Sequence, residues 1–229
     1  MTSAAPVLVA VAHGTSSPAG RSAIGSLVAA VAARRPDLTV RAAFVDVQPP
    51  GPAAVLSSLD ETVPARLVPL LLSAGYHVYV DLAEAAAAVP GTTVAPALGP
   101  DDRLAGLLLR RLVAAGLRDD DVVVLGAAGS SQPSAVVDCE RVAAALGDLL
   151  GRPVVAGFLS AAEPKLADAV AAQRLPGRRV LVATYLLAPG FFADLAGRSG
   201  ADVVTGPLLQ AHEPAPEELV DVVVERYLS

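Results

Sequence analysis

Short apolar runs alternate along the chain with longer segments whose apolar residues recur every three or four positions. The short runs predict strands buried on both faces, and the longer segments predict amphipathic helices. In residues 21–35, for example, Ile24, Leu27 and Val31 share one helical face, and Pro36 ends the segment. We predict strands at residues 6–12, 39–47, 66–72 and 93–97, and helices at residues 21–35, 53–59 and 102–115 and after a capping box at Asp81–Glu84.

The same order of elements begins again after the polar segment 116–121. Strands and helices that alternate twice predict an α/β fold with two similar domains, each a parallel sheet flanked by helices. We place these domains at residues 1–118 and 119–229. The second is expected to have strands at 122–126, 153–159, 179–187 and 202–204, helices at 135–150, 163–173 and 217–227, and turns at 129–133 and 189–195.

Three pairs of segments indicate that the second domain repeats the first. Each pair keeps an offset of 114 or 115 residues, and the three pairs occur in the same order. Chance similarity in an alanine-rich chain does not readily produce three such matches, so we infer an internal duplication. The pairs are HGTSSP (13–18) with AGSSQP (128–133), FVDVQPP (44–50) with FLSAAEP (158–164), and LLSAGYH (71–77) with LLAPGFF (186–192).

The composition of the chain limits which ligands and which cellular compartment are to be expected. The 229 residues carry a net charge of −6, which gives no reason to expect a nucleic acid or an anionic membrane as partner. A single cysteine, Cys139, excludes an intramolecular disulfide, and we expect it to be buried in a helix. The first apolar run lacks the basic region of a signal peptide, and no run approaches the roughly 18–20 residues of a membrane span. We expect a cytoplasmic protein, and a monomer because the duplication already supplies two walls of a cleft.

Two histidines and one carboxylate follow strands of the first domain. His13, Asp46 and His77 are expected at one edge of the sheet, because ligands of such sheets bind outside the carboxyl ends of the strands. Two imidazoles and a carboxylate form a usual ligand set for a divalent metal, and the same groups can accept protons when no metal is bound. Each residue alone has a simpler interpretation, as a hydrogen-bonded loop histidine or a turn-forming aspartate. The remaining histidine, His212, is expected on the surface.

The repeat lacks these groups. Ala128, Ser160 and Phe192 occupy the positions that match His13, Asp46 and His77. We therefore expect the first domain to carry the chemistry. The second domain would form the opposite wall, with Phe192 as an apolar surface.

At these residues the chain resembles the class II tetrapyrrole chelatases of the sirohydrochlorin chelatase type. VAVAHGTSSP, FVDVQPP and VPLLLSAGYHVYVDL carry the resemblance, and VVVLGAAGSSQP with VATYLLAPGFFADL resembles the companion domain of the long, two-domain members. The resemblance implies insertion of iron (Fe²⁺) or cobalt (Co²⁺), as a substrate and without an organic cofactor, into the tetrapyrrole sirohydrochlorin for sirohaem or cobalamin biosynthesis. A non-catalytic tetrapyrrole or metal carrier, and an unrelated two-domain binding module, are the alternatives.

The resemblance also implies roles for individual residues. It places the metal-site and catalytic histidines on His13 and His77. It places the carboxylate, usually a glutamate, on Asp46, which is one methylene shorter. One imidazole would hold the metal while the other, or Asp46, accepts protons from the ring nitrogens. Contacts with the tetrapyrrole are expected from Gly14, Thr15, Ser16, Gly75, Tyr76, Ser130, Ser131 and Phe192.

Overall fold

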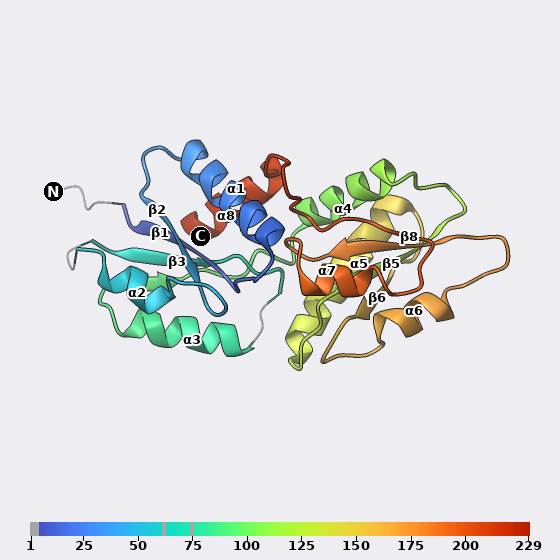
Figure 1. The fold of residues 1–229 in the computed structure, drawn as a ribbon, viewed down its shortest axis with the longest axis horizontal. Coiled ribbons are helices and arrows are strands. Elements are labelled where there is room, and N and C mark those ends of the chain that lie inside the picture. The colour runs from blue at the N-terminus through green and yellow to red at the C-terminus, as the bar shows by residue number, and fades with distance from the viewer. Residues whose placement is uncertain (1–4, 61–62, 74–75) are drawn as a thin grey trace.

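The computed structural model describes residues 5–60, 63–73 and 76–229, and of residues 76–79 the backbone alone. Figure 1 shows two lobes side by side, each built around a sheet with helices on both faces. In the described part of the chain, each lobe contains a parallel sheet of four strands, ordered β2-β1-β3-β4 in one and β6-β5-β7-β8 in the other. The two orders correspond strand for strand, so the predicted α/β fold with two similar sheets is confirmed.

The elements of the first half follow the predicted alternation. They are β1 (Val7–Ala12), α1 (Pro18–Arg34), β2 (Val40–Phe44), α2 (Pro52–Ser57), β3 (Ala65–Pro69), α3 (Tyr76–Ala87), β4 (Thr92–Val94) and α4 (Asp102–Ala114). Those of the second half are β5 (Val122–Ala127), α5 (Pro133–Leu150), β6 (Val155–Phe158), α6 (Leu166–Ala172), β7 (Val180–Tyr185), α7 (Phe191–Ala196), β8 (Val203–Val204) and α8 (Glu217–Leu228). No helix in the described residues is long and apolar enough to cross a membrane.

Strand β1 is buried along its whole length because helices cover both faces of its sheet. Successive side chains alternate between two cores. Val9 belongs to a cluster with Leu56 of α2 and Leu82 of α3. Leu8 belongs to a cluster with Leu27 of α1 that continues through α4, α5 and α8 into the second half. One apolar core therefore joins the two halves.

The last helix of each half packs against the other half. Helix α4 contacts α5 and β7, and α8 contacts α1 and β3. In Figure 1, α8 (red) accordingly lies in the lobe of β1–β3 and α4 (green) in the lobe of β5–β8. Arg226 of α8 donates hydrogen bonds to the carbonyls of Ala97 and Leu98 at 2.9 and 3.0 Å, and Tyr227 donates to Pro6 at 2.7 Å. Each of these two helices therefore packs against the half on the other side of the domain division that we predicted between residues 118 and 119. The division itself stays a prediction.

Several local predictions are wrong, including the ends of β3 and β4, which come three residues before the predicted ends at 72 and 97. Helix α3 begins at Tyr76, so Asp81 lies inside the helix and does not cap it. Strand β2 ends at Phe44, before the predicted end at residue 47, because the backbone turns at Val47, where φ is 65°. The predicted turn at residues 189–195 contains most of α7, which is held by Ala196, a fully buried residue of the core of the second half.

Candidate functional site

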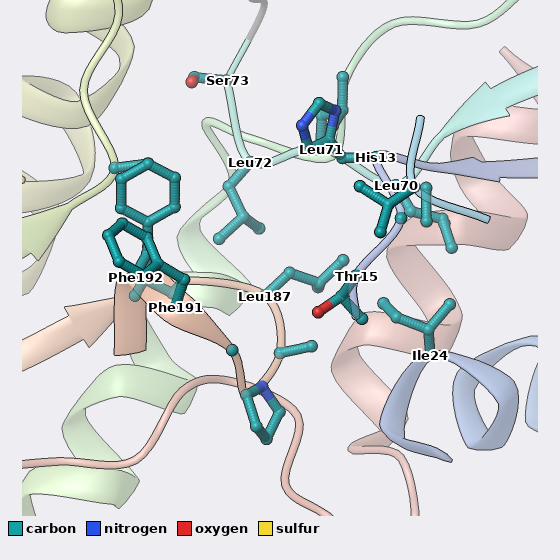
Figure 2. Close-up of a pocket in the computed structure, with 18 of the residues that line it drawn as sticks. His13, Thr15, Ile24, Leu70, Leu71, Leu72, Ser73, Leu187, Phe191 and Phe192 are labelled. Carbon is teal, nitrogen blue, oxygen red and sulfur yellow. The ribbon is translucent and has the colours of Figure 1, made fainter. Parts of the chain in front are cut away.

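A cavity of about 500 Å³ lies between the carboxyl ends of the two sheets. Residues at or just after the ends of β1, β2, β3, β5 and β7 line it, as expected for ligand sites of parallel sheets. Most of the lining is apolar, with His13 and a few hydroxyl and amide groups as the exceptions. Figure 2 shows His13, Thr15 and Ile24 from the first half and Leu187, Phe191 and Phe192 from the second around this space.

His13 occupies a turn that the neighbouring strand end holds in place. The amide of Asp46 donates to the carbonyl of His13 at 2.9 Å, and the amide of Thr15 donates to Oε1 of Gln48, also at 2.9 Å. Gly14 has a φ of 98°, and a Cβ at this position would lie 2.0 Å from the carbonyl oxygen of Asp46. Only glycine fits this turn, which fixes the backbone of the exposed His13 at the edge of the cavity.

The second half repeats this turn with an alanine in place of the histidine. The amide of Ser160 donates to the carbonyl of Ala128 at 2.9 Å. Gly129 has a φ of 89°, and a Cβ there would lie 1.9 Å from the carbonyl oxygen of Ser160. Ser130 Oγ accepts a hydrogen bond from the amide of Gln132 at 3.1 Å. The two turns therefore share a backbone and differ in the side chain that each presents to the cavity.

Asp46 is next to the cavity but does not line it. Its carboxylate accepts a hydrogen bond from the amide of Val47 at 2.7 Å, and the next two residues, Val47 and Gln48, line the cavity instead. Among the described residues, no three histidine, cysteine, aspartate or glutamate side chains form a cluster that could hold a metal ion. The role of Asp46 at the metal site stays a prediction.

His77 is the second residue of α3, and its side chain lies outside what the structure describes. The same holds for the side chain of Tyr76, and Gly75 lies outside the described residues altogether. The pairing of His13 with His77 is therefore still a prediction. The described backbone places the start of α3 seven residues after the end of β3.

Two phenylalanines form the wall on the side of the second half. Phe191 is 76% exposed and Phe192 is 37% exposed, and their rings pack edge to face with centroids 5.7 Å apart. Figure 2 shows both rings across the cavity from His13. Exposed aromatic pairs in a cavity indicate a surface for an apolar ligand. Phe192 was predicted from the sequence and Phe191 was not, although two adjacent aromatics in a chain with 3% aromatic residues were a usable signal.

The remaining candidate residues divide into two groups. Thr15, Ser16 and Ser130 line the cavity, whereas Ser131 does not. Thr15 and Ser130 each lie three residues before the first residue of α1 and α5, so the N-terminal ends of two long helices, where the helix dipole is positive, lie close to the cavity.

Two lining residues within regular elements were not predicted from the sequence either. Cys139 of α5 and Tyr185 of β7 both line the cavity. Burial raises the pKa of the Cys139 thiol to about 12 and holds the pKa of Tyr185 well above its usual value. An apolar helix or strand gives no local sign that its residues reach a cavity between two sheets, so these positions had no signal in the sequence.

Comparison with known proteins agrees with this geometry. The chain is similar to SirB from Bacillus subtilis with Fe3+ (19% identity, TM-score 0.78, covering 97% of this chain and 95% of that one). It is also similar to the sirohydrochlorin chelatase SirB from Bacillus subtilis subspecies spizizenii in complex with cobalt (17%, 0.77, 97% and 94%). A third similar structure is CbiX, the terminal enzyme for biosynthesis of siroheme in denitrifying bacteria (23%, 0.69, 96% and 98%). These similarities show a shared fold.

The curated protein sequences contain no significant match to the chain. The family model of CbiX matches residues 7–115 and 122–196, which include both strand-end turns and both walls of the cavity. The chain therefore belongs to the CbiX family of class II chelatases, as the resemblance predicted.

Proposed function

We propose that this protein is a sirohydrochlorin chelatase that inserts iron or cobalt into its tetrapyrrole. The observation that carries the proposal is the position of His13 at an apolar cavity, across from the Phe191–Phe192 pair. An imidazole is a ligand for both metals, and an aromatic pair suits one face of a flat macrocycle. Membership of the CbiX family supports the same reaction. Two similar solved structures, described as SirB with Fe3+ and with cobalt, support either metal as substrate.

The rim of the cavity suits the periphery of the substrate. Sirohydrochlorin carries carboxylates around an apolar ring, so its binding site needs hydrogen-bond donors at the edge and an apolar interior. Hydroxyl groups of Thr15, Ser16 and Ser130 line the cavity beside the N-terminal ends of α1 and α5. Helix N-termini favour bound anions through their free amides and dipoles. These donors would orient the macrocycle without a large positive charge.

The reaction needs a protein ligand that holds the incoming metal and groups that accept two protons. Two pyrrole N–H bonds break as the metal binds the four ring nitrogens. In the proposed mechanism, His13 holds the incoming metal at the face of the ring, and His77 or Asp46 accepts the released protons. The second half presents Ala128 where the first has His13. It would therefore bind the opposite face of the ring and take no part in proton transfer. Because one chain supplies both walls, we also propose that it acts as a monomer.

The proposal is tested by anaerobic absorbance assays with sirohydrochlorin and either Fe²⁺ or Co²⁺. His13→Ala and His77→Ala should each lower the rate by about 10²-fold or more, the range expected when a positioned acid–base group is lost. His212→Asn is the matched control. This histidine is exposed and outside the cavity lining, and asparagine tolerates its φ of 67°.

Two outcomes would contradict the proposal. Wild-type rates in both site variants would show that the assigned histidines are not used. Tight binding of sirohydrochlorin by the wild type, with metal insertion no faster than the spontaneous reaction, would instead indicate a carrier.

A further inference from the structure

A tyrosine of the second half bonds the backbone of the first half at the cavity. Tyr185, the last residue of β7, is 2% exposed, and its hydroxyl donates a hydrogen bond to the carbonyl of Leu72 at 2.9 Å. The two residues are 113 positions apart in the sequence, and both line the cavity. Burial holds the pKa of Tyr185 well above its usual value, so the hydroxyl keeps its proton and donates throughout the neutral pH range.

Further contacts fix the same stretch of backbone. A Cβ on Gly99 would lie 2.2 Å from the Tyr185 hydroxyl and 2.3 Å from the Leu72 carbonyl oxygen, so the three groups are in close contact. The amide of Leu98 donates to the carbonyl of Leu71 at 2.8 Å. The next residue, Ser73, lines the cavity together with Cys139 of the second half. Residues 71–73 are thus held by groups from both halves.

The corresponding stretch of the second half is held by its own half. Leu187 matches Leu72 in the duplication, and its carbonyl accepts a hydrogen bond from the amide of Leu209 at 2.8 Å. Leu70 occupies the position that matches Tyr185 and has no hydroxyl to donate. The bond between the halves is therefore one-directional. It runs from the half that lacks counterparts of His13 and His77 to the half that contains these two residues.

The stretch at residues 71–73 leads from β3 to the start of α3, where His77 is the second residue. We propose that Tyr185 is a positioning residue for metal insertion, whose hydroxyl fixes the backbone at Leu72 and so sets where the His77-bearing helix begins relative to the cavity. This inference rests on the proposed chelatase function. It gives the second half a role beyond that of a wall, because the second half would hold the backbone at Leu72, which precedes α3 in the chain.

Tyr185→Phe tests the role, because it keeps the buried ring and removes only the donor. We expect kcat for metallation of sirohydrochlorin to fall about tenfold or more, as small displacements of reacting groups do, while KM for the tetrapyrrole changes less than about threefold. The pH profile of kcat should keep its shape, because the hydroxyl does not titrate in the assay range. Hydrogen exchange should become faster in peptides that cover residues 70–80.

Thr184→Val is the matched control. Thr184 is the neighbouring residue of β7, and its buried hydroxyl donates to the carbonyl of Thr205 at 2.7 Å, within the second half. It should lower the unfolding midpoint about as much as Tyr185→Phe, since each loses one buried hydrogen bond, but leave kcat and the exchange of residues 70–80 unchanged. Gly99→Ala is a second variant. Its Cβ would overlap both the Tyr185 hydroxyl and the Leu72 carbonyl oxygen and so disturb this hydrogen bond, so kcat should fall here too.

The outcomes separate this inference from the proposed function. An active wild type with wild-type kcat in Tyr185→Phe would overturn the positioning role alone, as would equal losses of kcat in Tyr185→Phe and Thr184→Val. A wild type that does not insert metal would overturn the proposed function and the positioning role with it. A selective loss of kcat with faster exchange at residues 70–80 would establish the role.

Discussion

The duplicated turns allow one substitution to be made twice, once beside the histidine and once beside its alanine counterpart. Gly14→Ala would place its Cβ 2.0 Å from the carbonyl oxygen of Asp46, and Gly129→Ala would place its Cβ 1.9 Å from the carbonyl oxygen of Ser160. Both distances are far shorter than a van der Waals contact. Both glycines also have a positive φ, 98° and 89°, which a residue with a Cβ rarely adopts. The two perturbations are therefore nearly identical in backbone terms.

The expected cost in stability follows from this geometry. A residue held in a sparsely populated backbone region costs about 1–3 kcal/mol, and the overlap with the carbonyl has to be relieved by moving the adjacent loop. A loss of about 2 kcal/mol corresponds to a fall of roughly 4–8 °C in the unfolding midpoint of a chain of this size. We expect this fall in both variants, measured by thermal unfolding followed by circular dichroism.

Activity should distinguish the two variants. Gly14→Ala moves the backbone that carries His13, so we expect metallation to slow by about 10²-fold at a temperature where both variants are folded. Gly129→Ala moves a turn that carries Ala128 and Ser130. Its kcat should stay within about threefold of wild type, and any loss should instead raise KM for the tetrapyrrole. Equal losses of activity would refute the assignment of the chemistry to the first half. Unchanged stability in either variant would refute the steric reasoning.

Two further predictions concern groups outside the reaction itself. Burial opposes ionisation of Asp121, but the Arg179 guanidinium, at 2.6 and 2.9 Å, outweighs it and holds the pKa of this carboxyl below its usual range. Asp121→Asn should therefore lower the free energy of unfolding by about 2–3 kcal/mol at neutral pH. The difference in unfolding midpoint between this variant and the wild type should shrink as pH falls below about 4, because protonation of Asp121 then removes the same contribution from the wild type. A difference that does not depend on pH would contradict this. Burial raises the pKa of the Cys139 thiol to about 12 and leaves the residue 4% exposed. Its labelling by a disulfide reagent at pH 8 should therefore be at least about tenfold slower in native than in denatured protein, and similar rates would show that the thiol is accessible.

The two halves have the same topology but are not independent units. A helix from each half packs against the sheet of the other half. In addition to its hydrogen bonds to two backbone carbonyls, Arg226 of α8 forms an ion pair with Asp101 at 3.1 Å. The close contacts at Leu72, Gly99 and Tyr185 add a second connection at the cavity itself. The distance between the two walls is therefore set by packed secondary structure as well as by the chain connections.

The elements around the cavity differ in how well their sequence predicted them. Strand β1 was evident because a strand covered on both faces is apolar at every position, and the turn at His13 followed from its place at the end of that strand. The position of Asp46 was less predictable, because the direction of its side chain depends on a reversal at Val47 that an ordinary valine does not signal. Tyr185 could not be found, because in sequence it is one more large residue in a buried strand.

The sequence by itself determined the order of strands and helices except for α7, the duplication, and the half that carries the histidine turn. These properties depend on local periodicity and on residue identity at strand ends, which are written along the chain. The tertiary structure alone decided that α4 and α8 exchange halves, that both phenylalanines lie across the cavity from His13, and that a tyrosine of one half bonds the backbone of the other. An amphipathic helix shows which face is buried but not which sheet will cover it. Contacts between residues more than a hundred positions apart are fixed only when the two sheets pack.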